Sequence, residues 1–328
     1  MIFVNVTQIL YCYCFVIYKK SFPLLDFPIN KYYNIKKDKD LKMDLIQETK
    51  LMMKKYHITA NKNFGQNFLI DETVVNGIVE AADISKDDVI IEIGPGLGTL
   101  TAHLLEKAGK VICIELDKKM LDILHDRFYL YDNFELINQD VLKVDLANLI
   151  QTNLSFFQHV KVVANLPYYI TTPIIMKLLE SKLNLKSITV MVQKEVAERL
   201  VEIPGGKNTG AITYSIHYYT NPKLVIPVPN TSFIPSPKVD SSVIHLELLQ
   251  DPRIKPLDEE LFFKIIKIAF LQKRKTLINT LINGNFGDRA SLEKMLGALQ
   301  IDLKIRGEKL TLEQFQKIAD YLSTQSSF

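Results

Sequence analysis

The stretch Gly94-Pro95-Gly96-Leu97-Gly98 has the residue types of a turn that brings backbone N–H groups close to a nucleotide. Glu115 follows 21 residues after Gly94, where a carboxylate can accept both hydroxyls of a ribose. Asp140 could accept a hydrogen bond from an adenine amine. Each has an ordinary alternative: a packing turn for the glycines, a solvated loop acid for Glu115, and a helix N-cap for Asp140. A dinucleotide fingerprint would need glycine at position 99, where the chain has Thr99, so the spacing favours a ligand without a pyrophosphate.

The sharpest chemical signal is Asn165-Leu166-Pro167-Tyr168, which suits a planar base bearing an exocyclic amine. Such an amine is a poor nucleophile, because its lone pair is delocalised into the ring. The Asn165 side-chain oxygen and the Leu166 carbonyl could accept its hydrogen bonds and localise the lone pair toward an electrophile. Tyr168 could stack on the base, a contact worth about 1–3 kcal/mol in nucleic-acid complexes. The alternative is a simple turn at Asn and Pro.

Short apolar runs precede these segments and predict the strands that position them. The predicted strands are residues 89–93, 111–114, 134–137, 160–164 and 188–192. Helical patterns alternate with them, so we expect an α/β fold with a doubly wound, mostly parallel sheet. Ligands bind outside the carboxyl ends of the strands in such sheets, which is where the candidate residues fall. After Pro252 the pattern is purely helical and predicts a small all-α domain over residues 252–328.

Composition limits the classes of protein that remain. The chain has 328 residues, 47% hydrophobic and 23% charged, which suits an ordinary globular protein of about two domains. It excludes disorder over most of the length, collagen-like repeats and a polytopic membrane protein. Three cysteines and six scattered histidines fit neither a disulfide scaffold nor a metal site, so we expect no metal and a reducing, intracellular setting. A net charge of +3 permits an RNA partner without requiring one.

Residues 1–42 differ from the rest of the chain. An uncharged apolar run at 1–18 is followed by Lys19-Lys20, and residues 30–42 are rich in lysine. The apolar run is short for a membrane span, and its positive charge follows it, unlike that of a secretory signal. We therefore expect a disordered or non-native extension, upstream of a helical pattern that opens at Met43. A membrane or organelle anchor is the alternative.

From about Asn63 to the C-terminus, the chain resembles the ribosomal RNA adenine N6,N6-dimethyltransferases. These S-adenosylmethionine-dependent enzymes dimethylate adenosines near the 3′ end of small-subunit rRNA. The matching segments, in order and at family-like spacing, are Phe64-Gly65-Gln66-Asn67-Phe68-Leu69, Ile91-Glu92-Ile93-Gly94-Pro95-Gly96, Asn165-Leu166-Pro167-Tyr168, Gln193-Lys194-Glu195-Val196 and Phe233-Ile234-Pro235-Ser236-Pro237-Lys238-Val239-Asp240-Ser241. Residues 1–42 have no counterpart.

The resemblance implies a role for each candidate residue. The S-adenosylmethionine site would be lined by Asn67, Leu69, Gly94, Glu115, Asp140 and Asn165. Asn67 and Leu69 would lie near the methionine end of the cofactor, Glu115 would hold its ribose, and Asp140 its adenine. Phe233 would sandwich the flipped target base opposite Tyr168; the alternative is a core phenylalanine in a proline-rich turn.

The resemblance also implies the partner and the division of the chain. Residues 43–251 would form the methyltransferase domain, and residues 252–328 an RNA-binding domain. The partner would be small-subunit rRNA or an immature small subunit, with a role in small-subunit biogenesis. We expect a cytoplasmic monomer without a stable membrane partner. Three adjacent cations, Lys273-Arg274-Lys275, would bind RNA phosphate, unless they are only a solvated helix face.

Three other functions remain to be weighed. A resistance branch of the same family methylates large-subunit rRNA, but Leu166 and the segments 238–240 and 272–277 look more like the small-subunit branch. A binding role, as an assembly checkpoint or in organellar transcription, is the second; the intact segment 165–168 indicates that catalysis is retained, with any binding role alongside it. An NAD dehydrogenase is disfavoured by Thr99 and by the lack of a hydride-transfer constellation.

Overall fold

The computed structural model describes residues 43–60, 65–272 and 274–325. The chain divides into two compact units, Met1–Glu48 and Thr49–Phe328, and the candidate site belongs to the second. The expected extension over residues 1–42 lies outside the described residues. The first described helix is α3 (Leu45–Lys55), where a helical pattern was expected to open near Met43. Within the described ranges, no helix combines the length and apolar character needed to cross a bilayer.

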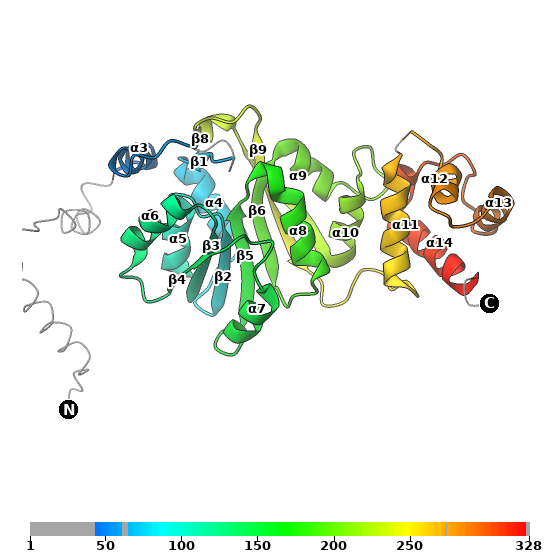
Figure 1. Cartoon of the computed structure of the whole chain (residues 1–328), viewed down its shortest axis with the longest axis horizontal. Coiled ribbons are helices and arrows are strands. Elements are labelled where there is room, and N and C mark those ends of the chain that lie inside the picture. Colours follow the sequence, from blue (N-terminus) through cyan, green and yellow to red (C-terminus); the bar gives the residue numbers. More distant parts are fainter. Residues whose placement is uncertain (1–42, 61–64, 273, 326–328) are drawn as a thin grey trace, which may run out of the picture. The chain divides into compact units, whose positions relative to one another are not determined.

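Seven strands form the central sheet, in the order β4-β3-β2-β5-β6-β9-β7 (Figure 1). The five parallel strands are β2 (Asp88–Ile93), β3 (Lys110–Glu115), β4 (Phe134–Asn138), β5 (His159–Asn165) and β6 (Ser187–Gln193). β9 (Ser241–Leu248) pairs antiparallel with β6 and with the edge strand β7 (Thr220–Val228). Continuous apolar runs such as Val89 to Ile91 are buried because helices cover both faces of the sheet. The predicted doubly wound, mostly parallel sheet is confirmed.

Helices connect the strands, and aspartate is the N-cap residue of three of these helices. The helices of this region are α4 (Glu72–Ala81), α5 (Thr99–Lys107), α6 (Lys118–Phe128), α7 (Leu146–Leu154), α8 (Thr171–Glu180), α9 (Lys194–Val201) and α10 (Ala211–Tyr219). Asp71, Asp117 and Asp145 accept hydrogen bonds from the first free N–H groups of α4, α6 and α7. These N-caps satisfy donors that a helix start would otherwise leave unpaired.

The C-terminal part of the second unit is helical, as predicted. It contains α11 (Glu259–Leu271), α12 (Leu277–Asn283), α13 (Arg289–Ala298) and α14 (Leu312–Gln325). Phe262, Ile265 and Ile266 of α11 are buried against residues of the other three helices. The same core includes Tyr214 of α10, whose hydroxyl donates to the Leu310 carbonyl at 2.6 Å. The helical core is thus continuous with the last helix before β7.

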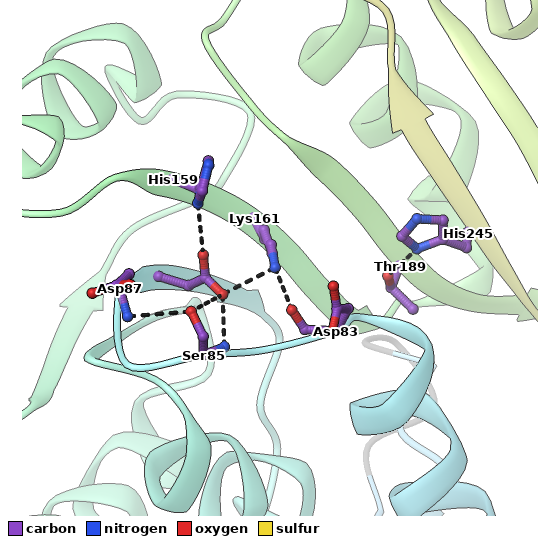
Figure 2. A network of polar contacts seen from close by, with 8 residues as sticks. Asp83, Ser85, Asp87, His159, Lys161, Thr189 and His245 are labelled. Atoms are coloured by element: carbon purple, nitrogen blue, oxygen red, sulfur yellow. Dashed lines mark hydrogen bonds and ion pairs between the residues drawn. The ribbon is translucent and has the colours of Figure 1, made fainter.

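A polar network around the buried residues Asp88 and Lys161 connects the amino ends of β2 and β5 (Figure 2). The Lys161 ammonium donates to Asp88 Oδ2 at 2.9 Å and to the Asp83 carbonyl. Ser85 donates to the same carboxylate oxygen through its N–H at 2.7 Å and its hydroxyl at 3.1 Å. His159 Nδ1 lies 3.2 Å from Asp88 Oδ1. The network therefore lies at the end of the sheet opposite the carboxyl ends of the strands.

A second, two-stranded sheet joins distant parts of the sequence. β1 (Phe68–Leu69) pairs antiparallel with β8 (Phe233–Ile234), with Leu69 opposite Phe233. The Ser232 hydroxyl donates to Asp71 Oδ2 at 2.8 Å, which ties the same two segments together beyond the strands. The segment before α4 and the loop before β9 are therefore held against each other.

Candidate active site

One pocket lies at the carboxyl ends of β2, β3, β4 and β5, the edge at which ligands bind in sheets of this topology. About 1040 Å³ of space lies between its walls, the open solvent at its mouth included. The candidate residues that line it are Asn67, Leu69, Gly94, Glu115, Asp140, Asn165, Leu166 and Tyr168. The structure thus brings together segments from five separate parts of the chain.

The glycine turn after β2 forms one wall of the pocket. Gly96 and Gly98 have φ values of +58° and +79°, in the left-handed region that glycine adopts without strain. A Cβ atom on Gly98 would lie 2.6 Å from the Phe128 ring, so a side chain has no space there. Because α5 begins at Thr99, which also lines the pocket, the helix N-terminus with its free N–H groups is at the ligand site.

Glu115 ends β3 with a buried carboxylate held by backbone donors. Its Oε1 accepts from the N–H groups of Leu116 and Asp117 at 2.8 Å each, and Oε2 from Gly96 at 3.4 Å. Burial raises the pKa of this carboxyl, and the backbone hydrogen bonds offset only part of that effect. The alternative of a solvated loop acid is therefore wrong. A buried, oriented acceptor at this position suits a pair of ligand hydroxyls.

Asp140 follows β4 and belongs to a turn. Its Oδ1 accepts from the Leu142 N–H at 3.0 Å. The next helix, α7, is capped by Asp145, so the alternative of Asp140 as its N-cap is wrong. Asn67 and Leu69 reach the pocket from the segment around β1, where the Asn67 amide nitrogen donates to the Gly65 carbonyl at 3.1 Å.

β5 delivers Asn165 and the three residues after it to the pocket. The Asn165 Nδ2 atom donates to the Asn67 carbonyl at 3.4 Å, which leaves Oδ1 as the acceptor of that side chain. The Leu166 N–H donates to the neighbouring strand β6 at 3.2 Å, so this peptide is anchored to the sheet. Tyr168 opens a 3₁₀ turn, η2 (Tyr168–Ile170), and its hydroxyl lies 2.6 Å from Ser241 Oγ.

Some predicted residues lie away from this pocket. Phe233 is only 3% exposed and pairs with Leu69 across the small sheet, outside the pocket lining. Arg274 and Lys275 are exposed between α11 and α12, also outside the pocket, while Lys273 lies outside the described residues. In the part of the chain that the structure describes, no group of three or more His, Cys, Asp and Glu side chains could hold a metal ion.

The pocket also contains a carboxyl group that the sequence interpretation missed. Glu92, in β2, lines the pocket although its side chain is only 2% exposed. Its Oε2 accepts from the Thr101 hydroxyl at 2.6 Å and lies 3.4 Å from Cys113 Sγ. Burial raises the pKa of Glu92 to about 7. A carboxylate inside an otherwise apolar strand was the available signal.

The variant Glu92→Gln should change how stability depends on pH. Because the folded-state pKa is raised, the contribution of this group is complete below pH 4.5, its ordinary pKa, and is lost as the pH rises through about 7. Above pH 7 the loss is on the order of 3 kcal/mol. The glutamine side chain cannot ionise, so the variant does not lose this contribution. The unfolding free energy of the variant minus that of the wild type should therefore increase between pH 5 and pH 8. Urea unfolding of the ligand-free protein measures this, and parallel pH profiles would contradict it.

Comparison with known proteins agrees with the geometry. A family profile described as "Ribosomal RNA adenine dimethylase" matches residues 57–324. The chain is 46% identical over 278 residues to "Ribosomal RNA small subunit methyltransferase A" of Alkaliphilus oremlandii (strain OhILAs), covering 84% of this chain and 96% of the relative. A protein of the same name from Clostridium acetobutylicum is 50% identical over 272 residues, covering 83% and 97%. The crystal structure of a dimethyladenosine transferase from Plasmodium falciparum matches with a TM-score of 0.66 at 27% identity, covering 79% of this chain and 98% of that one. The chain belongs to the ribosomal RNA adenine dimethylase family.

Proposed function

We propose that this protein transfers methyl groups from S-adenosylmethionine to N6 of two adjacent adenosines near the 3′ end of small-subunit rRNA, giving N6,N6-dimethyladenosine. The observation that carries the proposal is the orientation of Asn165 at the end of β5. Its amide nitrogen is engaged by the Asn67 carbonyl, so its oxygen is the atom left to accept from an exocyclic amine in the pocket. Family membership supports the reaction class, and the names of the bacterial relatives support the small subunit as the target.

The pocket fits S-adenosylmethionine by the chemistry of its donors and acceptors. The buried Glu115 carboxylate suits the ribose hydroxyls, and Asp140 suits the adenine amine. The left-handed backbone at Gly94 and Gly96 leaves that wall of the pocket without side chains. Asn67 and Leu69 would contact the methionine end. When bound, the cofactor supplies a methyl group on a sulfonium, which is already activated toward a nucleophile.

The residues of the chain would then act mainly by alignment. Asn165 Oδ1 and the Leu166 carbonyl accept from the target amine and localise its lone pair in line with the methyl group. No strong base is needed, because a methylated N6 ammonium is very acidic and loses its proton to water. The target adenine must leave its stack to reach the pocket. We infer that Tyr168 stacks on one of its faces and Phe233 on the other, which requires the buried Phe233 ring to become accessible when RNA binds.

The test is methyl transfer itself. The protein is incubated with labelled S-adenosylmethionine and unmethylated small subunits or large subunits, and the labelled nucleotide is mapped. Label on two adjacent adenosines near the 3′ end of small-subunit rRNA is the expected result. Label on large-subunit rRNA would assign the chain to the resistance branch, and binding of small subunits without transfer would leave only the assembly role.

The cluster Lys273-Arg274-Lys275 should contribute to RNA affinity by binding phosphates. Arg274 and Lys275 are exposed in the turn between α11 and α12, and a guanidinium can hold a phosphate with two parallel hydrogen bonds. Removing one such interaction with a phosphate flattens the log–log salt dependence of binding by roughly 0.7–0.9 units. Changing all three residues to serine should therefore weaken RNA binding and lower that slope by about two units. Cofactor binding should stay unchanged. An unaltered slope with unaltered affinity would show that the cluster is merely solvent-exposed and does not bind RNA.

A further inference from the structure

The hydroxyl of Tyr168 is held by a residue outside the pocket. The Tyr168 oxygen and Ser241 Oγ share a hydrogen bond of 2.6 Å. Tyr168 is in a short 3₁₀ turn, whereas Ser241 is completely buried and begins β9. Ser241 lies between Gln193 of β6 and Val228 of β7 in the sheet register. The partner that fixes the end of the Tyr168 ring is therefore part of the rigid sheet.

The loop that leads to Ser241 is itself closed by hydrogen bonds. Asp240 accepts from the Asn230 N–H at 3.0 Å through its side chain and from the Lys194 N–H at 3.0 Å through its carbonyl. The Ser236 hydroxyl donates to the Asn230 carbonyl at 2.6 Å. Phe233, the other aromatic side chain assigned to the target base, is carried by the same loop. One loop therefore presents Phe233 and ends at the residue that holds Tyr168.

We propose that Ser241 is a positioning residue, which fixes the Tyr168 ring in the orientation that receives the target adenine. This inference rests on the proposed adenine methylation and extends it to a residue that makes no contact with cofactor or base. A tyrosine ring rotates about two side-chain bonds, and a hydrogen bond at its far end removes that freedom before the base arrives. Tyr168 then serves through its ring, because its hydroxyl is committed to Ser241.

The electrostatics agree with this role. Burial raises the pKa of Tyr168, and the hydrogen bond with Ser241 lowers it by a smaller amount. The phenol therefore stays neutral at physiological pH and does not act as a base toward the target amine. What the hydrogen bond with Ser241 provides is orientation.

The test is a mutant cycle measured with the full chain and unmethylated small subunits. Ser241→Ala and Tyr168→Phe each remove one side of the hydrogen bond, and each should lower kcat/KM for the small subunit by about tenfold. The double variant should be no worse than either single variant, because both remove the same interaction. Tyr168→Ala also removes the stacking surface, so its kcat/KM should be lower than that of Tyr168→Phe. Adding Ser241→Ala to Tyr168→Ala should then leave kcat/KM unchanged.

Two measurements separate positioning from a general loss of structure. The dissociation constant for S-adenosylmethionine should stay within about twofold of the wild type in both single variants, because neither hydroxyl is assigned to the cofactor. Ser242→Ala is the matched control: Ser242 is the next residue of β9 and is also buried, but adjacent strand residues face opposite sides of a sheet. Its kcat/KM should be unchanged.

The outcomes distinguish this inference from the function on which it rests. A wild-type chain that methylates no rRNA would overturn both. An active wild type in which the Ser241→Ala and Tyr168→Phe effects multiply, or in which Ser241→Ala equals the wild type, would overturn the positioning role alone. If Ser241→Ala does not fold, Tyr168→Phe decides the question, since activity equal to the wild type would show that the hydrogen bond is not used.

Discussion

Replacing Asn165 with alanine should lower kcat for methyl transfer by about 100- to 1000-fold, the range seen when a single preorganised hydrogen-bonding group is removed from an active site. The Asn165 oxygen is assigned to the target amine, so the variant loses the interaction that localises the lone pair. Cofactor binding should weaken only about fivefold, which corresponds to one neutral hydrogen bond. Single-turnover kinetics with saturating S-adenosylmethionine, together with calorimetry of cofactor binding, measure the two quantities separately.

Asn138→Ala is the matched control for this experiment. Asn138 ends the strand β4 at the same edge of the sheet, but its amide donates to the Glu115 carbonyl at 2.9 Å and it does not line the pocket. Any effect should therefore fall on cofactor affinity, with turnover of the saturated enzyme unchanged. If Asn165→Ala instead abolished cofactor binding and left turnover of the bound fraction normal, Asn165 would be a cofactor residue only.

The second large effect concerns stability. Lys161→Met should lower the free energy of unfolding by about 3–5 kcal/mol, because it leaves the Asp88 carboxylate buried without its lysine partner. The Lys161 and Asp88 side chains are 8% and 1% exposed, and their charged atoms are 2.9 Å apart. Lys110→Met is the matched control at the same edge of the sheet. Lys110 pairs with Glu135 at 2.6 Å, but these side chains are 29% and 39% exposed, so its loss should cost less than about 1 kcal/mol.

The same ion pair predicts a pH dependence of opposite sign to that of Glu92. Burial alone would raise the pKa of Asp88, but the hydrogen bonds from Lys161 and Ser85 outweigh it and lower the pKa below its usual range. Its contribution to stability is therefore complete above about pH 4 and is lost as the pH falls. Urea unfolding should show that the cost of Lys161→Met shrinks in acid, and that the double variant Asp88→Asn/Lys161→Met recovers much of the lost stability. A cost independent of pH would contradict this interpretation.

The parallel half of the fold was predictable because its strands are continuous apolar runs bounded by polar turns. The run at 89–93 became β2, and the run at 160–164 became β5, each within one residue at either end. β7 could not be found in this way. It contains Pro222 and Pro227 and exposes Leu224, which a strand tolerates only at the edge of a sheet. Its assignment depends on pairing with β9, which the local sequence does not reveal.

The sequence predicted which residues gather at the site better than it predicted the contacts that hold each of them. The residues at the strand ends converge on one pocket, because the topology of a parallel sheet places those ends together. Glu92 was missed because its pattern is that of a core strand, and Ser241 because its role depends on a hydrogen bond with Tyr168 across the fold. The burial of Phe233 follows from its pairing with Leu69, a distant residue in the sequence. Such pairings are fixed by tertiary packing, which no local pattern encodes.

The pairing of β1 with β8 also bears on the order in which the molecule is completed. Phe68 lies opposite Ile234, so the chain between these two residues is one long loop that the small sheet closes. Closing so long a loop is entropically unfavourable, whereas neighbouring strands and helices of the parallel half meet sooner. The pocket wall that carries Asn67 should therefore gain protection from hydrogen exchange late in refolding. During translation it cannot form before β8 has left the exit tunnel, so the proposed cofactor site of a chain whose proposed substrate is ribosomal RNA is completed only late in the synthesis of that chain.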